Sequence, residues 1–288
     1  MNGRPVARRS RTPLPGRRTR PVRRASAGLS TVRAGAALAM LVSAAGIYGV
    51  GESSAFDYTK LQLDGVRFTN ASAVEAALAA ARGENLFQLS TGPLRSALED
   101  LPTVASARVE VRLPGTLAVT IDERQPVLVW QVGTERYLAD ADGALFAKLP
   151  DKAPTGTPEL PVVDDRRASA ADLVVGGRLD AVDLDAATRL ASLIPEHVGS
   201  SAVSLEVAVT DENGFVVSAR PAGWSAVFGF YTPSLRTTEL IPGQVQLLRT
   251  LLIGQEQLVE RVILASATDG TFVRRATPSA KAKPSKAP

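Results

Sequence analysis

A run of eighteen uncharged residues, 34–51, constrains this chain more than any other feature of its sequence. At a helical rise of ~1.5 Å per residue the run would be roughly 27 Å long, close to the ~30 Å hydrocarbon core of a bilayer. Arg33 and Tyr48 can reach the two interfaces from the ends of such a helix. The run therefore predicts a membrane-spanning helix, whose principal anchor residues are Ala34, Leu38, Leu41, Val42, Ile47 and Val50.

Charged residues are unevenly distributed along the 288-residue chain. Residues 1–51 hold ten arginines and no acid, and residues 274–288 hold five cations and no acid. Of the 33 cations, 18 remain in residues 52–273 with all 29 acids, which gives that body a net charge of −11. Because cationic segments stay on the cytoplasmic side, the arginines predict a single-pass type II protein of the plasma (inner) membrane. Residues 1–33 are then a disordered cytoplasmic tail, residues 34–51 the transmembrane helix, and the body is extracytoplasmic.

Two other interpretations of the N-terminal region compete with a membrane anchor. A cleaved secretory signal peptide also has a basic segment, an apolar stretch and small residues such as Ser53 and Ala55 near a cleavage site. The basic region and the apolar run are both long for a signal peptide, so we favour an uncleaved anchor. A nucleic-acid-binding arm would use aromatic side chains to stack on bases, and the tail has none. We therefore expect the tail to face anionic lipid and to bind no nucleic acid.

The body begins with a pattern that mixes helix and strand. Residues 60–68 alternate apolar and polar side chains, as a half-buried strand does. A capping box that begins at Ser72 predicts a first helix, and Thr91 opens a second. Two alternating segments around Pro114-Gly115 then predict a β-hairpin. The order strand, helix, helix, strand, strand predicts two helices on one face of a three-stranded sheet.

The remainder of the body is predicted to be rich in strands. Two alternating segments flank Asn213-Gly214, a pair typical of hairpin turns. Beyond residue 275 the proline, alanine and lysine content predicts a disordered tail over 276–288. Other predicted elements are helices at 184–194 and 244–252 and a strand at 259–266.

Residues 101–130 (LPTVASARVEVRLPGTLAVTIDERQPVLVW) resemble the signature of the FtsQ/DivIB family of bacterial cell-division proteins. Residues 137–146 (YLADADGALF) resemble the next hairpin of that family. The chain departs from the family pattern at Thr103, where an aromatic residue is common, and at Leu113, where an aromatic residue follows the arginine. The positions that carry the resemblance are Leu101, Pro102, Val104, Ala107, Val109, Pro114, Leu117, Glu123, Arg124, Gln125, Pro126 and Trp130.

The resemblance implies a fold class, a domain organisation and a function. The fold is α+β: a single N-terminal transmembrane helix, a POTRA domain (βααββ) at 56–126 and a β-rich FtsQ/DivIB domain at 127–275. The implied function is a noncatalytic divisome scaffold that links early and late cell-division proteins at the septum and helps control septal peptidoglycan synthesis. The implied partners are small bitopic FtsB-like and FtsL-like proteins and other divisome members, with membrane lipid around the anchor.

No set of side chains in the sequence assembles a catalytic or ligand-binding site. His197 is the only histidine and cysteine is absent, so we expect neither a catalytic triad nor a histidine or thiolate metal site. The pairs Asp164-Asp165 and Asp140-Asp142 are better explained as turn residues, because nothing separates the pKa values within either pair. No glycine-rich phosphate-binding motif is present. We expect no enzyme activity, cofactor, metal or small-molecule substrate.

Binding through an open sheet edge is the mode of action that the sequence favours. An extended partner segment can add a strand to such an edge through backbone hydrogen bonds. The alternative is that the candidate edge segment, residues 261–265, is an internal strand of the sheet. A second class of function also stays open, an exported POTRA-containing polypeptide-binding or assembly factor outside division; a hydrolase built on carboxylates alone is a remote third. The candidate edge, which lacks proline and has one charge, consists of Arg261, Val262, Ile263, Leu264 and Ala265.

Overall fold

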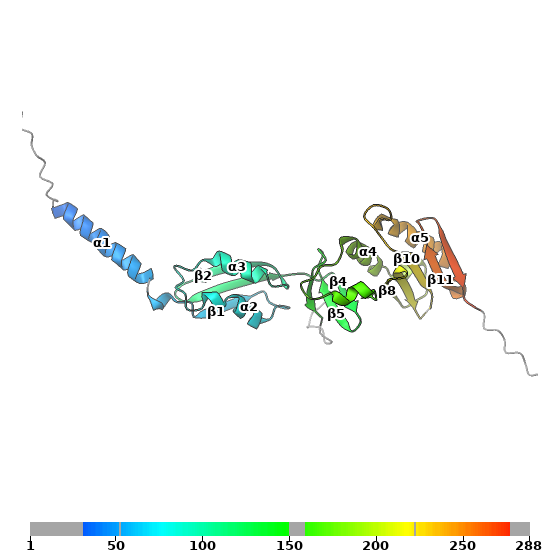
Figure 1. Ribbon diagram of the computed structural model, residues 1–288, viewed down its shortest axis with the longest axis horizontal. Helices are drawn as coiled ribbons and strands as arrows, with labels where there is room; N and C mark the ends of the chain where they lie inside the picture. Colours follow the sequence, from blue (N-terminus) through cyan, green and yellow to red (C-terminus); the bar gives the residue numbers. More distant parts are fainter. Residues whose placement is uncertain (1–30, 52, 150–158, 222, 277–288) are drawn as a thin grey trace, which may run out of the picture. The chain divides into compact units, whose positions relative to one another are not determined.

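The computed structural model describes residues 31–51, 53–149, 159–221 and 223–276, and it divides into two units at residue 52 (Figure 1). The first unit contains helix α1, Thr31–Gly51. Among the described residues, α1 is the one helix long and apolar enough to cross a membrane, with a mean hydropathy of 1.4. Most of the two predicted terminal tails lies outside the described residues. The six predicted anchor residues are exposed along α1, and they are Ala34, Leu38, Leu41, Val42, Ile47 and Val50.

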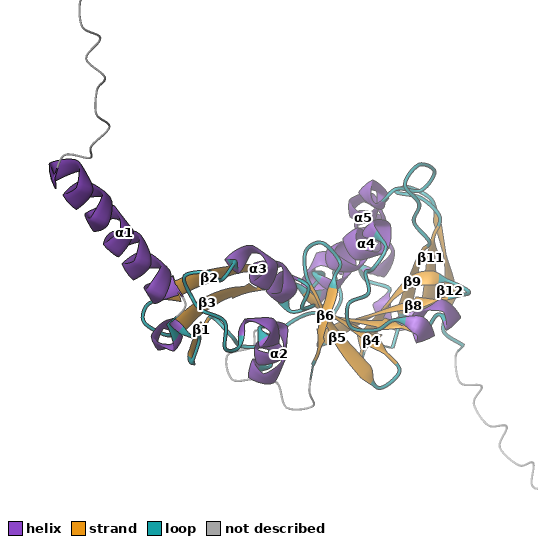
Figure 2. Cartoon of the chain, turned by 60° about the vertical axis from the view of Figure 1, so that its left-hand side comes forward, coloured by secondary structure: helices purple, strands orange, loops and turns teal. Residues whose placement is uncertain are grey.

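The second unit begins with a three-stranded sheet and two helices (Figure 2). The strand order is β1-β3-β2, with β1 parallel and β2 antiparallel to β3. Parallel neighbours need a crossover connection, which α2 and α3 supply. The predicted order of strand, helix, helix, strand, strand is confirmed. The elements are β1 (Lys60–Asp64), α2 (Ala71–Ala77), α3 (Thr91–Glu99), β2 (Val104–Arg112) and β3 (Thr116–Glu123), with short 3₁₀ turns η1 (Ser54–Phe56) and η2 (Ala79–Ala81).

One hydrophobic cluster joins both helices to the same face of this sheet. Leu117, Val119 and Ile121 alternate along β3 and therefore point to one side. Leu78, which follows α2, and Leu98 of α3 are buried in the same cluster. Burying one such leucine contributes roughly 1.5–3 kcal/mol. This amphipathic pattern explains why the helices pack where they do.

Two local predictions in this region are corrected by the structure. Helix α2 begins at Ala71, because the side chain of Asn70 accepts the N–H of Ser72 at 3.0 Å and caps the helix. Ser72 therefore lies inside the helix. Strand β1 ends at Asp64 because Gly65 turns the chain with a φ of 88°, and a Cβ there would lie 2.0 Å from the carbonyl oxygen of Ile121.

A nine-stranded sheet follows, in the order β12-β11-β10-β9-β8-β7-β4-β5-β6. The pairs β4–β7, β7–β8 and β10–β11 are parallel, and the other neighbours are antiparallel. Its strands are β4 (Leu128–Val132), β5 (Glu135–Ala139), β6 (Leu145–Lys148), β7 (Val162–Asp165), β8 (Ser204–Thr210), β9 (Gly214–Arg220), β10 (Ser225–Gly229), β11 (Val259–Leu264) and β12 (Gly270–Arg274). The helices are α4 (Ala181–Ala191) and α5 (Ile241–Leu252), and the 3₁₀ turns are η3 (Ala168–Asp172), η4 (Pro195–Val198), η5 (Thr238–Leu240) and η6 (Glu256–Leu258).

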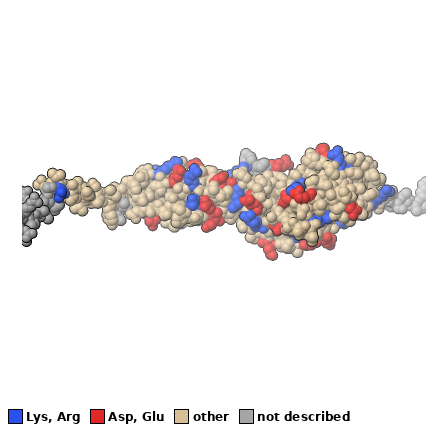
Figure 3. All heavy atoms as spheres, turned by 90° about the horizontal axis from the view of Figure 1, so that it is seen from above, with Lys and Arg blue, Asp and Glu red and all other residues tan. Residues whose placement is uncertain are grey.

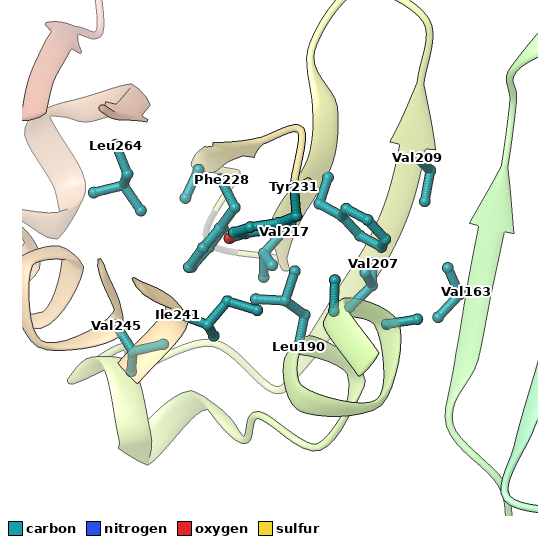
Figure 4. Packing of buried hydrophobic residues seen from close by; sticks show 14 of the residues in the cluster. Val163, Leu190, Val207, Val209, Val217, Phe228, Tyr231, Ile241, Val245 and Leu264 are labelled. Carbon is teal, nitrogen blue, oxygen red and sulfur yellow. The ribbon is translucent and has the colours of Figure 1, made fainter. Parts of the chain in front are cut away.

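Helices α4 and α5 pack on this sheet and enclose its core (Figure 4). Leu190 of α4 and Ile241 of α5 point toward Val207 and Val217 of the central strands. Trp130 of β4 is fully buried in the same cluster. These contacts make the sheet a rigid support for its two edges.

In the middle of the sheet, the side chains that alternate with this core make the opposite face polar. Gln131, Glu206, Ser218 and Ser225 line an open hollow there. On the face that Figure 3 presents, acidic and basic side chains of the second unit are interspersed. No single-sign patch dominates that view.

Candidate partner-binding edge

The predicted edge strand lies inside the sheet. β11 pairs in parallel with β10 on one side and antiparallel with β12 on the other. The edge prediction is therefore wrong, and the alternative of an internal strand is confirmed. The cause is a tight turn in which the N–H of Ser266 donates to the carbonyl of Asp269 at 3.0 Å, so that the next residues fold back onto β11. Of the predicted edge residues, Arg261, Val262, Ile263 and Leu264 lie in β11, and Ala265 follows it.

β12 is the edge strand at this end of the sheet. The N–H of Arg275 donates to the carbonyl of Leu258 across β11 at 2.8 Å. Because the backbone groups of a strand alternate in direction, the N–H groups of Arg274 and Phe272 point away from β11. They face the position where a tenth strand would lie.

The side chains of β12 differ between its two faces. Phe272 pairs with Val262 and packs partly buried against the core, whereas Val273 is 50% exposed. Thr271 is exposed opposite Ile263, which is itself 42% exposed. The edge thus combines free backbone groups with a small apolar strip on the open face of the sheet.

Two polar side chains hold β10 and β11 together where this parallel pair ends. Gln244 of α5 is fully buried, and its Nε2 donates to the carbonyls of Phe228 (3.2 Å) and Leu264 (3.0 Å). Arg236 donates to the same two carbonyls at 2.6 and 2.8 Å. The hydroxyl of Tyr231 donates to Oε1 of Gln244 at 2.7 Å, and burial raises the pKa of Tyr231 so that this proton stays in place. This network positions β11 and, through it, the β12 edge.

The residues weighed as candidate catalytic groups have structural partners. Nδ1 of His197 accepts the N–H of Ile194 at 3.4 Å. Asp165 is not a turn residue: it is buried in β7, where it accepts the indole N–H of Trp130 (3.2 Å) and pairs with Arg167 (2.8 Å). The described residues contain no group of three or more side chains suited to a metal ion.

The turn interpretation holds for the pair Asp140-Asp142. Oδ1 of Asp140 accepts the backbone N–H groups of Asp142 (3.0 Å) and Ala144 (2.8 Å), which is how an aspartate closes a turn. Asp164 pairs with Arg166 at 2.6 Å on the surface of β7.

Residues that carry the family resemblance organise the connection between the two sheets. Glu123, at the end of β3, accepts the N–H groups of Phe68 (2.9 Å) and Thr69 (2.6 Å). Burial alone would raise the pKa of Glu123, but hydrogen bonds from the Thr69 side chain and from the backbone of residues 67–69 outweigh it and lower the pKa below the usual range. Arg124 pairs with Asp140 at 2.6 Å, so adjacent residues tie this connection to both sheets.

A hydroxyl pair and an aromatic pair complete the connection. The hydroxyls of Thr69 and Thr103 are 2.8 Å apart, so the chain has a hydrogen bond at the position where the resemblance leads one to expect an aromatic residue. The rings of Phe68 and Phe146 meet edge to face with centroids 5.8 Å apart.

Known proteins share part of this sequence. The model of the FtsQ-type POTRA domain matches residues 56–124. A protein named cell division protein FtsQ from Mycobacteroides abscessus is 33% identical over 133 residues, which are 46% of this chain and 42% of the relative. These matches support the FtsQ/DivIB family for this chain, and residues 56–124 match its POTRA domain.

Two further relatives have the same name. The protein from Chloroflexus aurantiacus is 29% identical over 172 residues, 60% of this chain and 61% of the relative. The protein from Burkholderia pseudomallei is 31% identical over 140 residues, 48% of this chain and 54% of the relative. The chain thus spans between 42% and 61% of the length of these three relatives.

Sequence reasoning missed three parts of the candidate site. It did not predict that β12 is the edge strand. It also passed over Arg236 and Gln244, although a glutamine in the apolar stripe of a predicted helix is a signal that a buried hydrogen-bond partner is needed. Both side chains act on backbone carbonyls, which a sequence pattern does not display.

Proposed function

We propose that this FtsQ/DivIB-family chain is a noncatalytic scaffold of the divisome, which links early and late division proteins at the septum and helps control septal peptidoglycan synthesis. The names of its relatives and the FtsQ-type POTRA domain support a role in cell division. The open β12 edge supports the binding role, because it offers backbone hydrogen-bonding groups to a partner strand.

The scaffold is anchored by α1 as a single-pass type II membrane protein. The length and hydropathy of α1 support this anchoring, and the arginines that precede it support a cytoplasmic N-terminus. The division septum is then the place where the extracytoplasmic body acts. Protease added to spheroplasts should digest residues beyond 52 and leave the arginine-rich tail protected.

The partners at β12 are extended segments of small bitopic proteins of the FtsB and FtsL type. Such a segment gains backbone hydrogen bonds from Phe272 and Arg274, and it meets Thr271 and Val273 on the open face. The POTRA domain is left to recruit the chain through other divisome members.

Localisation in dividing cells tests this function. A fluorescent fusion that replaces the full chain should gather at the septum, and depletion of the chain should block constriction. An even distribution around the envelope, or normal constriction without the chain, would favour an assembly factor outside division.

A further inference from the structure

The segment that follows the anchor is fixed to the POTRA domain from its first described residue. The carbonyl of Ser53 accepts the side-chain N–H of Asn85 at 2.9 Å, and the carbonyl of Phe56 accepts the N–H of Leu86 at 2.9 Å. The N–H of Tyr58 donates to the carbonyl of Glu84 at 3.0 Å. These bonds place the segment against the turn at 84–87.

Only one residue, Glu52, separates Ser53 from Gly51, where α1 ends. Two residues of extended chain reach at most about 7 Å. The headgroup layer of one leaflet is roughly 5–7 Å thick, because a bilayer of about 40–45 Å contains a ~30 Å hydrocarbon core. Chain connectivity alone therefore brings the first POTRA residues to the headgroups if α1 spans the core.

Apolar side chains are exposed at this end of the POTRA domain. Phe87 is 52% exposed, and its ring meets that of Phe56 edge to face with centroids 4.9 Å apart. Leu113, in the β2–β3 turn, is 51% exposed. The carbonyl of Gly115 in that turn accepts the N–H groups of Thr59 (2.9 Å) and Lys60 (3.0 Å), which brings the turn beside the segment after the anchor. Isolated exposed apolar residues are ordinary, but these come from three segments that meet.

We propose that Phe56, Phe87 and Leu113 form an interfacial patch that binds the outer headgroup layer of the membrane and holds the POTRA domain against it. The inference rests on the proposed anchoring by α1. Aromatic side chains favour the membrane–water interface, where an apolar ring meets a polar layer. Lys60 and Arg82 are exposed at this end, but so is Glu84, so the patch binds through its apolar groups and does not select anionic lipid.

Tryptophan fluorescence of the full chain in phosphatidylcholine vesicles tests the patch. The two native tryptophans, Trp130 and Trp224, are buried in the β-rich region, so a Phe87→Trp variant adds one reporter against a constant background. We expect its emission to shift to the blue and to be quenched by brominated acyl chains. Phe230→Trp is the matched control, because Phe230 is 47% exposed in the β-rich region, and it should not be quenched.

A second variant and a flotation assay make the outcome decisive. Adding Phe56→Ser and Leu113→Ser to Phe87→Trp should reduce the quenching, and anionic phosphatidylglycerol should not increase it. If the Phe87→Trp chain floats with the vesicles but its added indole stays unquenched, the patch is overturned and the anchoring stands. If the emission responds only to an added division protein, the patch is also overturned, and these residues bind a protein partner instead. A chain that does not float overturns the anchor and the patch together.

Discussion

Glu256 connects three segments of the β-rich region, and its loss should weaken the support of β11. Its carboxylate accepts the hydroxyl of Ser200, the N–H (3.0 Å) and hydroxyl (2.6 Å) of Ser201, and the indole N–H of Trp224 (2.9 Å). Burial alone would raise its pKa, but the hydrogen bonds from these three residues outweigh it and hold the pKa at about 2, against an ordinary value of 4.5. The carboxylate therefore stabilises the fold in its charged form.

The pKa difference sets the size of the effect. At about 1.36 kcal/mol per pKa unit, a difference of about 2.5 gives an upper limit of ~3.4 kcal/mol. Solvent screening at this partly exposed side chain reduces the expected contribution to about 1–2 kcal/mol. Because the folded-state pKa is the lower one, this stability is present above about pH 4.5 and is lost as the pH falls toward 2.

Urea unfolding followed by tryptophan fluorescence measures this contribution. At pH 7, Glu256→Gln should lower the free energy of unfolding by about 1–2 kcal/mol, and the difference from the unaltered chain should shrink steadily between pH 4.5 and pH 2. Glu239→Gln is the matched control, since Glu239 is 76% exposed in its pair with Arg189 and should change stability by less than about 0.5 kcal/mol. A Glu256→Gln effect of equal size at pH 7 and pH 2.5 would refute the reasoning.

Two further stability predictions follow from buried polar groups. Gln244→Leu should lower the free energy of unfolding, measured in urea, by about 1–3 kcal/mol, because the buried hydroxyl of Tyr231 loses its acceptor. Adding Tyr231→Phe should recover part of this loss. No recovery would show that the hydrogen bond between Tyr231 and Gln244 contributes little to stability. Arg167→Met should cost about 3–5 kcal/mol, because it leaves the carboxylate of Asp165, whose side chain is 0% exposed, without its cation. The control Arg166→Met removes a surface pair and should cost under about 1 kcal/mol; equal effects of the two substitutions would contradict the buried-pair argument.

Local patterns predicted the elements of this chain because those elements depend on local physics. The Asn213-Gly214 pair predicts a hairpin, and the structure has β8 and β9 on either side of it at Ser204–Thr210 and Gly214–Arg220. The POTRA order followed in the same way from alternation and helix signals. Even the error at Ser72 was small, since Asn70 is an equally good N-cap two residues earlier.

The position of each strand in the sheet was not predictable by such means. Whether β11 is an edge depends on whether the next five residues return to it, and Gly270–Arg274 show no strong alternation that would announce a strand. The support from Arg236 and Gln244 is also nonlocal, since both reach the carbonyls of Phe228 and Leu264 from elsewhere in the chain. A candidate site built from backbone groups is therefore visible only in the folded structure.

Crosslinking and pull-down from dividing cells, with the full chain as bait, test most directly whether β12 receives a partner strand. Arg274→Pro removes a backbone N–H that points away from β11. The carbonyl of the partner strand that would accept this N–H is then left unpaired, which costs about 1–3 kcal/mol and corresponds to roughly 5- to 150-fold weaker binding. Arg274→Ala keeps that N–H and is the control for loss of the side chain. We expect an FtsB-like protein to be recovered with Arg274→Ala and lost with Arg274→Pro, while the urea midpoint stays unchanged. Equal recovery with both variants would contradict this expectation.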